Sequence, residues 1–224
     1  MAPPMFIMDE MFWVELFFSM IIIVSCMVIY FRTRELYSLS FYKGIKYFSN
    51  AFLFFAIAFF ARFFLRFIAF FGGPSRADHF IFGFGFFIFL YAGLMAGFFL
   101  LYSSAWKEFK NPEQLNWMFH PLAAAVAAAV IIFLFREETL LFLGLLFLVA
   151  AIFAYSNNKH SSNKDKARSF HVVYALLFVS FVLEGIAHLF VMISIVASIL
   201  LYAVSSSLFL IILQRVIKST ERHK

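Results

Sequence analysis

Apolar residues along this chain are gathered into long runs separated by short polar segments. A helix needs about 20 apolar residues to cross a hydrocarbon core of about 30 Å. The runs predict seven transmembrane helices, at residues 12–31, 47–71, 79–103, 116–135, 139–155, 169–190 and 192–214. The longest polar stretch, Ser156 to Arg168, is too short for a soluble domain. We therefore expect residues 1–224 to form one all-α seven-helix transmembrane bundle.

Basic residues predict the orientation of this bundle. Alternate loops and the tail carry 14 of the 18 lysines and arginines: Arg32, Arg34, Lys43, Lys46, Lys107, Lys110, Lys159, Lys164, Lys166, Arg168, Arg215, Lys218, Arg222 and Lys224. The loops richer in lysine and arginine face the cytoplasm in membrane proteins. Seven spans then leave the N-terminus outside and the C-terminus in the cytoplasm. We expect a multi-pass protein of the cell membrane, with the lipid bilayer as its main partner.

Composition agrees with this class. Hydrophobic residues make up 64% of the chain and charged residues 13%, whereas soluble domains hold about 45–50% and about 25%. The net charge of +6 needs no nucleic-acid partner, because basic loops are attracted to anionic lipid headgroups. Cys26 is the single cysteine, which excludes an intrachain disulfide. The acidic N-terminus is also unlike a cleaved signal peptide, so we expect the first helix to be retained.

Four charged residues fall inside predicted spans, Glu15, Arg62, Arg66 and Glu184, and His188 is a borderline fifth. A charge at the centre of a membrane helix costs about 2.5–3.5 kcal/mol on insertion scales, so each one requires a partner or a function. Counted at 1.5 Å per residue, all five lie in the outer half of the membrane, with Arg62 deepest at about 14 Å.

Polar residues at helical spacing extend this cluster. Residues four apart share one helix face, which aligns Ser180 with Glu184 and His188, and Ser194 with Ser198, Tyr202 and Ser205. If the seventh helix lies beside the first, the stripes of helices one, two, six and seven converge. The fourth and fifth helices carry no such stripe and are predicted to face lipid or another subunit. The candidate ligand-binding or buried ion-pair residues are Arg62, Arg66, Glu15, Glu184, His188, Ser194, Ser198 and Tyr202.

Several interpretations of this cluster remain open. The charges form an outward-facing pocket for a polar or anionic ligand, or they pair with one another to fix helix register. Glu15 and Arg66 are also shallow enough to extend to the lipid headgroups. A turn at Gly185 would instead place Glu184 and His188 in water.

A metal site is the weakest of the candidate chemistries. Glu184 and His188 have the i, i+4 spacing of a ligand pair, and Asp78 and His79 lie at the same side of the membrane. Zinc sites need three or four ligands, and this set is incomplete. We expect no metal and no cofactor.

Gly93 and Gly97 form a GxxxG motif flanked by Ala92 and Ala96. Small residues at this spacing allow close packing between membrane helices.

The run Arg34-Glu-Leu-Tyr-Ser-Leu-Ser, with Lys43-Gly-Ile-Lys-Tyr-Phe, resembles a group of uncharacterised archaeal seven-helix proteins over the first two helices. Across the whole chain, size and topology resemble the microbial rhodopsins. That resemblance implies a retinal bound to a lysine of the last helix, but residues 192–214 contain no lysine. Retinal chemistry is therefore excluded.

The topology is also similar to two further classes of seven-helix protein. The SWEET sugar transporters have prolines that let their helices rock, whereas Pro3, Pro4, Pro74, Pro112 and Pro121 all fall outside the predicted helix interiors. Seven-helix sensor modules precede kinase or cyclase domains, and these 224 residues contain no such domain.

We therefore hypothesise a receptor-like or sensor protein. Arg62 would bind an anionic or polar ligand group, Glu184 would orient it, and the basic loops would engage a cytoplasmic or membrane protein partner. The alternatives are a small transporter or channel and a structural subunit of a membrane complex. An enzyme is least supported, because no nucleophile–base pair or metal set can be assembled.

Overall fold

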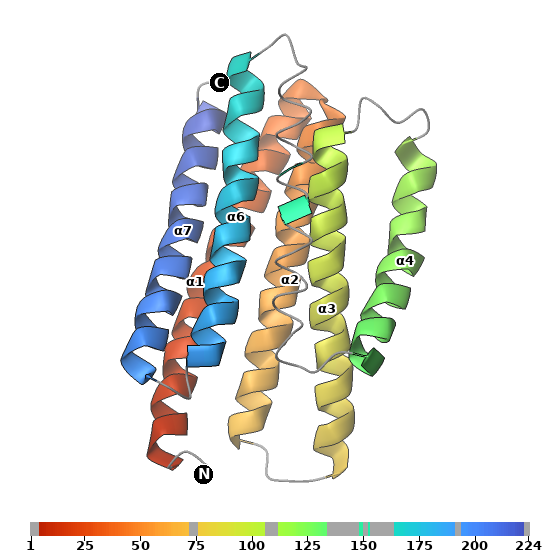
Figure 1. The fold of residues 1–224 in the computed structure, drawn as a ribbon. Helices are drawn as coiled ribbons and strands as arrows, with labels where there is room; N and C mark the ends of the chain where they lie inside the picture. Colours follow the sequence, from red (N-terminus) through yellow and green to blue (C-terminus); the bar gives the residue numbers. More distant parts are fainter. Residues whose placement is uncertain are drawn as a thin grey trace.

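In the computed structural model, six long helices make up nearly all of the described residues: α1 (Met5–Ser40), α2 (Lys43–Phe71), α3 (Arg76–Ala105), α4 (Pro112–Phe133), α6 (Lys164–Phe190) and α7 (Ile195–Glu221). The structure describes residues 5–71, 76–105, 112–133, 148–149, 152, 164–190 and 194–221. Helices α1 to α4 alternate in direction, as do α6 and α7, while α4 and α6 run in the same direction (Figure 1). We call the end where α1 begins the N-terminal end of the bundle, and the end where α7 finishes its C-terminal end.

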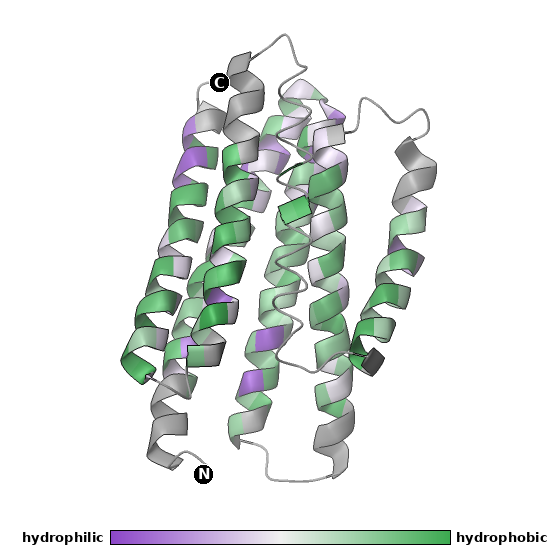
Figure 2. Ribbon diagram, in the orientation of Figure 1, coloured by the Kyte–Doolittle hydropathy of each residue, from purple (hydrophilic) through white to green (hydrophobic). Residues whose placement is uncertain are grey.

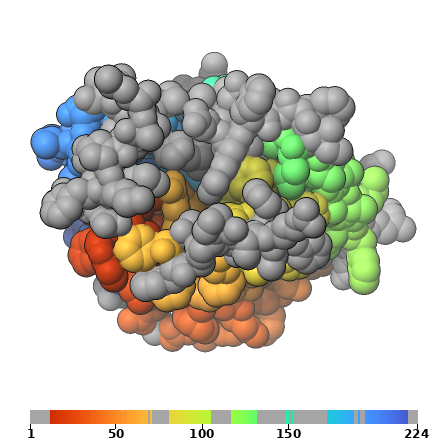
Figure 3. Space-filling view, turned by 90° about the horizontal axis from the view of Figure 1, so that it is seen from below, coloured from red at the N-terminus to blue at the C-terminus, as the bar shows by residue number. Residues whose placement is uncertain are grey.

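The helices are arranged so that α2 is central. It packs against α1 and α3, while α7 packs against both α1 and α6, and α4 packs against α3. Seen from the N-terminal end, α1 and α7 share one flank and α4 lies on the opposite flank (Figure 3). The expectation that the last helix lies beside the first is confirmed.

Polarity is distributed in the opposite way to that of a soluble protein. Figure 2 shows helices that are mostly hydrophobic along their length, with hydrophilic bands near their ends and on the lower part of α2. On α7, Val196 and Leu200 are 69% and 61% exposed, whereas Ser198 and Ser205 are fully buried. Such an exposed apolar surface is stable against hydrocarbon but not against water.

Four of the described helices are long and apolar enough to cross a membrane, in the segments Phe12–Ser40, Lys43–Ile68, Ile81–Ser104 and Ile195–Lys218. Two shorter apolar segments are Trp117–Ile131 and Val172–Ala187. The described residues thus form an all-helical protein of membrane character. The predicted fifth helix, 139–155, lies outside the described residues except for Leu148, Val149 and Ile152, which are helical.

An aromatic stripe on α2 forms the centre of the core. Phe48, Phe52, Phe55 and Phe59 recur every three or four residues and are almost fully buried. The ring of Phe59 lies 5.9 Å from that of Phe209 on α7, and Phe55 and Phe59 both contact Phe181 on α6. These contacts bring α6 and α7 against the side of α2 that carries Arg62, and so position the charged residues.

Helix α1 is longer than the predicted span 12–31, because the polar segment after residue 31 continues as helix to Ser40. Within it, the Thr33 hydroxyl donates to the carbonyl of Ile29 at 2.7 Å. The connection to α2 is only two residues long, and Phe41 takes a left-handed conformation with φ of 52°. The segment predicted as a connecting loop is therefore mostly helical.

Pro121 corrects a second expectation, because it lies inside α4. The helix instead begins at Pro112. A proline at this position removes no hydrogen bond, because the first N–H of a helix has no partner within the helix. In the interior Pro121 cannot donate to the carbonyl of Trp117, so the helix loses one hydrogen bond there. The statement that no proline interrupts a helix is wrong for α4.

A tight contact between α2 and α3 gives a matched pair of substitutions. A Cβ on Gly85 would lie 2.5 Å from Cδ2 of Leu65, whereas one on Gly83 would meet nothing within 4 Å. Overpacking costs about 1–3 kcal/mol, and replacing a helical glycine by alanine recovers about 1 kcal/mol. We expect Gly85→Ala to lower the thermal midpoint in detergent and Gly83→Ala to leave it unchanged or raise it. Equal midpoints for the two variants would contradict this close approach.

Candidate functional site

Helix α2 presents two arginines one turn apart, and each meets a glutamate from a different helix. Nη1 of Arg62 donates to Oε2 of Glu184 on α6 at 2.5 Å. Residues four apart lie one above the other on a helix face, so Arg66 lies next to this pair on the same face. Glu184 is buried in the interior of α6, with 2% of its side chain exposed. The turn at Gly185 considered from the sequence does not form, because α6 continues to Phe190.

The second pair joins α2 to α1. Nε of Arg66 lies 2.8 Å from Oε2 of Glu15, and Nη2 of Arg66 donates to Oε1 at 3.2 Å. Oε1 also accepts a hydrogen bond from the Tyr202 hydroxyl of α7 at 3.2 Å. Oε2 is buried and, despite its short distance to Nε, receives no aligned hydrogen bond. The carboxylate of Glu15 thus links three helices with part of its accepting capacity unused.

Two serines connect the first pair to α7. Oγ of Ser205 lies 3.4 Å from Oε1 of Glu184 and 2.6 Å from Oγ of Ser180 on α6. Both serines are fully buried. Buried hydroxyls need hydrogen-bond partners, and here α6 and α7 supply them to each other. The network of Arg62, Glu184, Ser205 and Ser180 therefore spans α2, α6 and α7.

The two other predicted serines have local roles. Ser194 precedes α7, and its hydroxyl accepts a hydrogen bond from the N–H of Ala197 at 3.4 Å, as an N-cap residue does. Ser198 donates to the carbonyl of Ala187 on α6 at 3.0 Å. Ser194 thus caps the start of α7, and Ser198 links α7 to α6. The side chain of His188 lies outside the described residues.

The side chains of the Arg66–Glu15 pair are more exposed than those of the Arg62–Glu184 pair. The Arg66 side chain is 32% exposed and that of Arg62 is 13% exposed, while Glu15 and Glu184 are at 7% and 2%. Both carboxylates are closed off, and Arg66 is the group of the cluster that a molecule from the N-terminal end reaches first. A cationic side chain such as Arg66, held by one buried carboxylate, can exchange that partner for another anion. Within the same residues, no group of three or more metal-ligand side chains comes together.

Sequence reasoning missed two polar contacts between helices. Oη of Tyr91 on α3 lies 2.6 Å from Nδ1 of His120 on α4, so the fourth helix is not held by apolar contacts alone. Ser103 on α3 lies 2.6 Å from the hydroxyl of Tyr174 on α6. Neither pair has a sequence signal, because the partners are 29 and 71 residues apart and belong to no common stripe.

Gly93 and Gly97 are both buried on α3, as are Ala92 and Ala96 beside them. Helix α3 packs against α2 on one side and α4 on the other. No motif indicates the close approach of Gly85 to Leu65. The packing role of Gly93 and Gly97 stays a prediction.

Comparison with known proteins gives one relative over the full length. The chain is 31% identical to an uncharacterised protein of the archaeon Archaeoglobus fulgidus over 229 residues, which cover 97% of each protein. No family model matches the chain, and no solved structure matches it. The resemblance to uncharacterised archaeal proteins is confirmed in this form, while the likeness to microbial rhodopsins stays a prediction.

The buried pair of Arg62 and Glu184 gives a second test. Removing one partner of a buried ion pair costs about 3–5 kcal/mol, whereas replacing both by apolar residues is often neutral. We expect Arg62→Met to lower the thermal midpoint strongly and the double variant Arg62→Met, Glu184→Met to recover most of that loss. Thermal unfolding in detergent measures both. A double variant as unstable as the sum of its single variants would show that the two side chains are not coupled.

Proposed function

We propose that this chain, which belongs to the family of the uncharacterised Archaeoglobus fulgidus protein, is a receptor-like or sensor protein of the cell membrane. In this proposal seven helices cross the membrane, the N-terminal end of the bundle faces outward and the C-terminal end faces the cytoplasm. The ligand is a small molecule with an anionic group, and it binds among α1, α2, α6 and α7.

The exposure of Arg66 is the observation that carries this proposal. Its side chain is 32% exposed, although it is paired with a carboxylate that is almost fully buried. An ion pair that served only to fix the helix register would work equally well if it were fully buried. An anionic ligand that arrives from outside meets this guanidinium, which can bind carboxylate or phosphate through two parallel hydrogen bonds.

Competition for Arg66 supplies a way to transmit the signal. An anion on Arg66 displaces Glu15, whose Oε1 also accepts the hydrogen bond of Tyr202. The Glu15 carboxylate is 7% exposed and cannot stay buried without its partner. Helices α1 and α7 therefore have different preferred packing with and without ligand, which is the differential interaction that a ligand-driven change requires.

A transporter or channel receives less support. The serines of α7 that would line a polar path are occupied in bonds within the protein: Ser198 donates to the carbonyl of Ala187 and Ser206 to that of Tyr202. The described helix that contains an interior proline, α4, packs against α3 and away from the charges. A structural subunit would use the exposed face of α4, where Trp117 and Met118 are 80% and 64% exposed.

Cysteine labelling tests the proposed topology, because Cys26 is the only native cysteine and is fully buried. In a Cys26→Ala background, we expect a membrane-impermeant maleimide to label Met5→Cys in intact cells. Lys43→Cys and Glu221→Cys should be labelled only after lysis. Labelling of Glu221→Cys in intact cells, with Lys43→Cys still protected, would mean an even number of spans and would overturn the seven-helix arrangement.

Anion binding tests the proposed site. Ligand at 100 times its dissociation constant stabilises a protein by about 2.7 kcal/mol. We expect at least one of acetate, glutamate, phosphate and sulfate to raise the thermal midpoint at constant ionic strength, and Arg66→Gln to abolish the rise. Arg34→Gln is the matched control, since Arg34 is exposed at the other end of the bundle. Equal loss of the response in both variants, or no response in the unmodified protein, would refute the site.

A further inference from the structure

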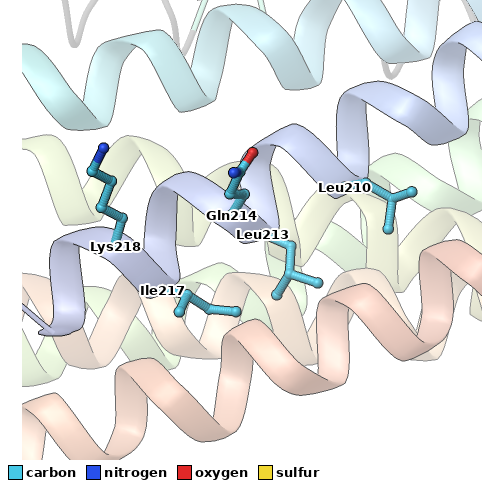
Figure 4. Close-up of a pocket in the computed structure, with 5 residues that line it drawn as sticks. All are labelled: Leu210, Leu213, Gln214, Ile217 and Lys218. Atoms are coloured by element: carbon cyan, nitrogen blue, oxygen red, sulfur yellow. The ribbon is translucent and has the colours of Figure 1, made fainter.

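A groove lies along the last turns of α7, at the opposite end of the bundle from the arginine pairs. Leu210, Leu213, Gln214, Ile217 and Lys218 line this open groove, which has a volume of about 460 Å³. Figure 4 shows these five side chains following one another along α7, with Leu210 at one end and Lys218 at the other.

The lining of the groove changes from apolar to cationic along the helix. Leu210, 47% exposed, lies toward the middle of α7, and Lys218 lies in its last turn. Eight residues of helix separate the two, a rise of about 12 Å. A phospholipid has the same polarity gradient over a similar length, with its acyl chains deep in the membrane and its phosphate at the interface.

The surroundings of the cationic end favour a negative headgroup. Arg215 is exposed one turn before Lys218 on α7, and the neighbouring helix α1 exposes Arg32 and Arg34 at the same end. Of these, Arg32 is paired with Glu35 at 3.9 Å. Each lysine or arginine near a membrane surface adds about 1 kcal/mol of attraction to anionic lipid.

Gln214 adds a polar requirement inside the groove. Its side chain is exposed one turn below Lys218, on a helix whose span is long and apolar enough to lie in a membrane. An amide that faces hydrocarbon without a partner is costly. Phosphate or glycerol oxygens of a lipid seated in the groove would accept its hydrogen bonds, whereas acyl chains alone would not.

We propose that this groove binds one anionic phospholipid, with the phosphate held by Lys218 and Gln214 and an acyl chain along Leu210, Leu213 and Ile217. This inference rests on the proposed insertion in the membrane, but not on the proposed anion site at Arg66. The occupant is a lipid rather than a protein segment, because the wall of the groove is apolar at depth and basic only at the interface.

Native mass spectrometry of the full chain in detergent, with added dioleoyl phosphatidylglycerol or dioleoyl phosphatidylcholine, tests the proposal. We expect phosphatidylglycerol to bind more tightly than phosphatidylcholine. Lys218→Gln should weaken phosphatidylglycerol binding by about fivefold, the effect expected of one lysine near an anionic surface. Leu210→Trp should also weaken it, because the larger side chain fills the apolar end of the groove without changing any charge.

Two variants serve as controls. Lys43→Gln removes an exposed lysine at the same end of the bundle, and Arg66→Gln alters the proposed anion site. Lys43→Gln should bind phosphatidylglycerol as the unmodified protein does. Arg66→Gln should keep the preference for phosphatidylglycerol over phosphatidylcholine, so the lipid proposal and the proposed function can fail separately. An equal loss for Lys43→Gln and Lys218→Gln would reduce the effect to general charge attraction and overturn the site. Equal affinity for phosphatidylglycerol and phosphatidylcholine would also overturn the site. The same holds if Leu210→Trp binds phosphatidylglycerol fully and has an unchanged thermal midpoint.

Discussion

The charge of Glu184 constrains the packing of the described helices more than any other feature. Its side chain is 2% exposed in the interior of α6, where an unpaired carboxylate would be very costly. Arg62 of α2 satisfies it, and this pair fixes the rotation and the height of α6 against α2. Because Arg66 lies one turn further along the same helix, its pair with Glu15 fixes α1 in the same way. Two ion pairs from one face of α2 thus define the positions of three helices.

Polar contacts are important here because apolar contacts alone do not select a partner in a membrane. Lipid tails are as apolar as leucine, so membrane helices associate through close packing and hydrogen bonds. The bonds between Ser180 and Ser205, and from Tyr202 to Glu15, provide this selectivity for α7. The aromatic stripe of α2 then fills the space that these bonds enclose. Specificity comes from few polar residues, and the area of contact comes from phenylalanine.

The sequence makes the helices and the charged cluster predictable, but not the internal face of every helix. Charges in apolar runs are rare enough to be noticed, and their spacing on helices places them on common faces. In α2, however, phenylalanine occurs on all sides: Phe59 is buried while Phe60 is 58% exposed. Sequence spacing does not tell the buried phenylalanines from the exposed ones. Which of them are buried depends on where α6 and α7 lie. The contact of Gly85 with Leu65 is unpredictable for the same reason, since it depends on how two helices meet.

Helix α7 connects the two proposed sites physically. Tyr202 bonds to Glu15 near one end, and Lys218 lies 16 residues further along the same helix, a rise of about 24 Å. The helix contains no proline or glycine between them, the residues at which helices most often kink. A shift of α7 that follows release of Glu15 therefore also changes the groove. A lipid that prefers one position of α7 must therefore change the affinity of Arg66 for an anion. By thermodynamic linkage, the anion changes the affinity of the groove for that lipid by the same factor.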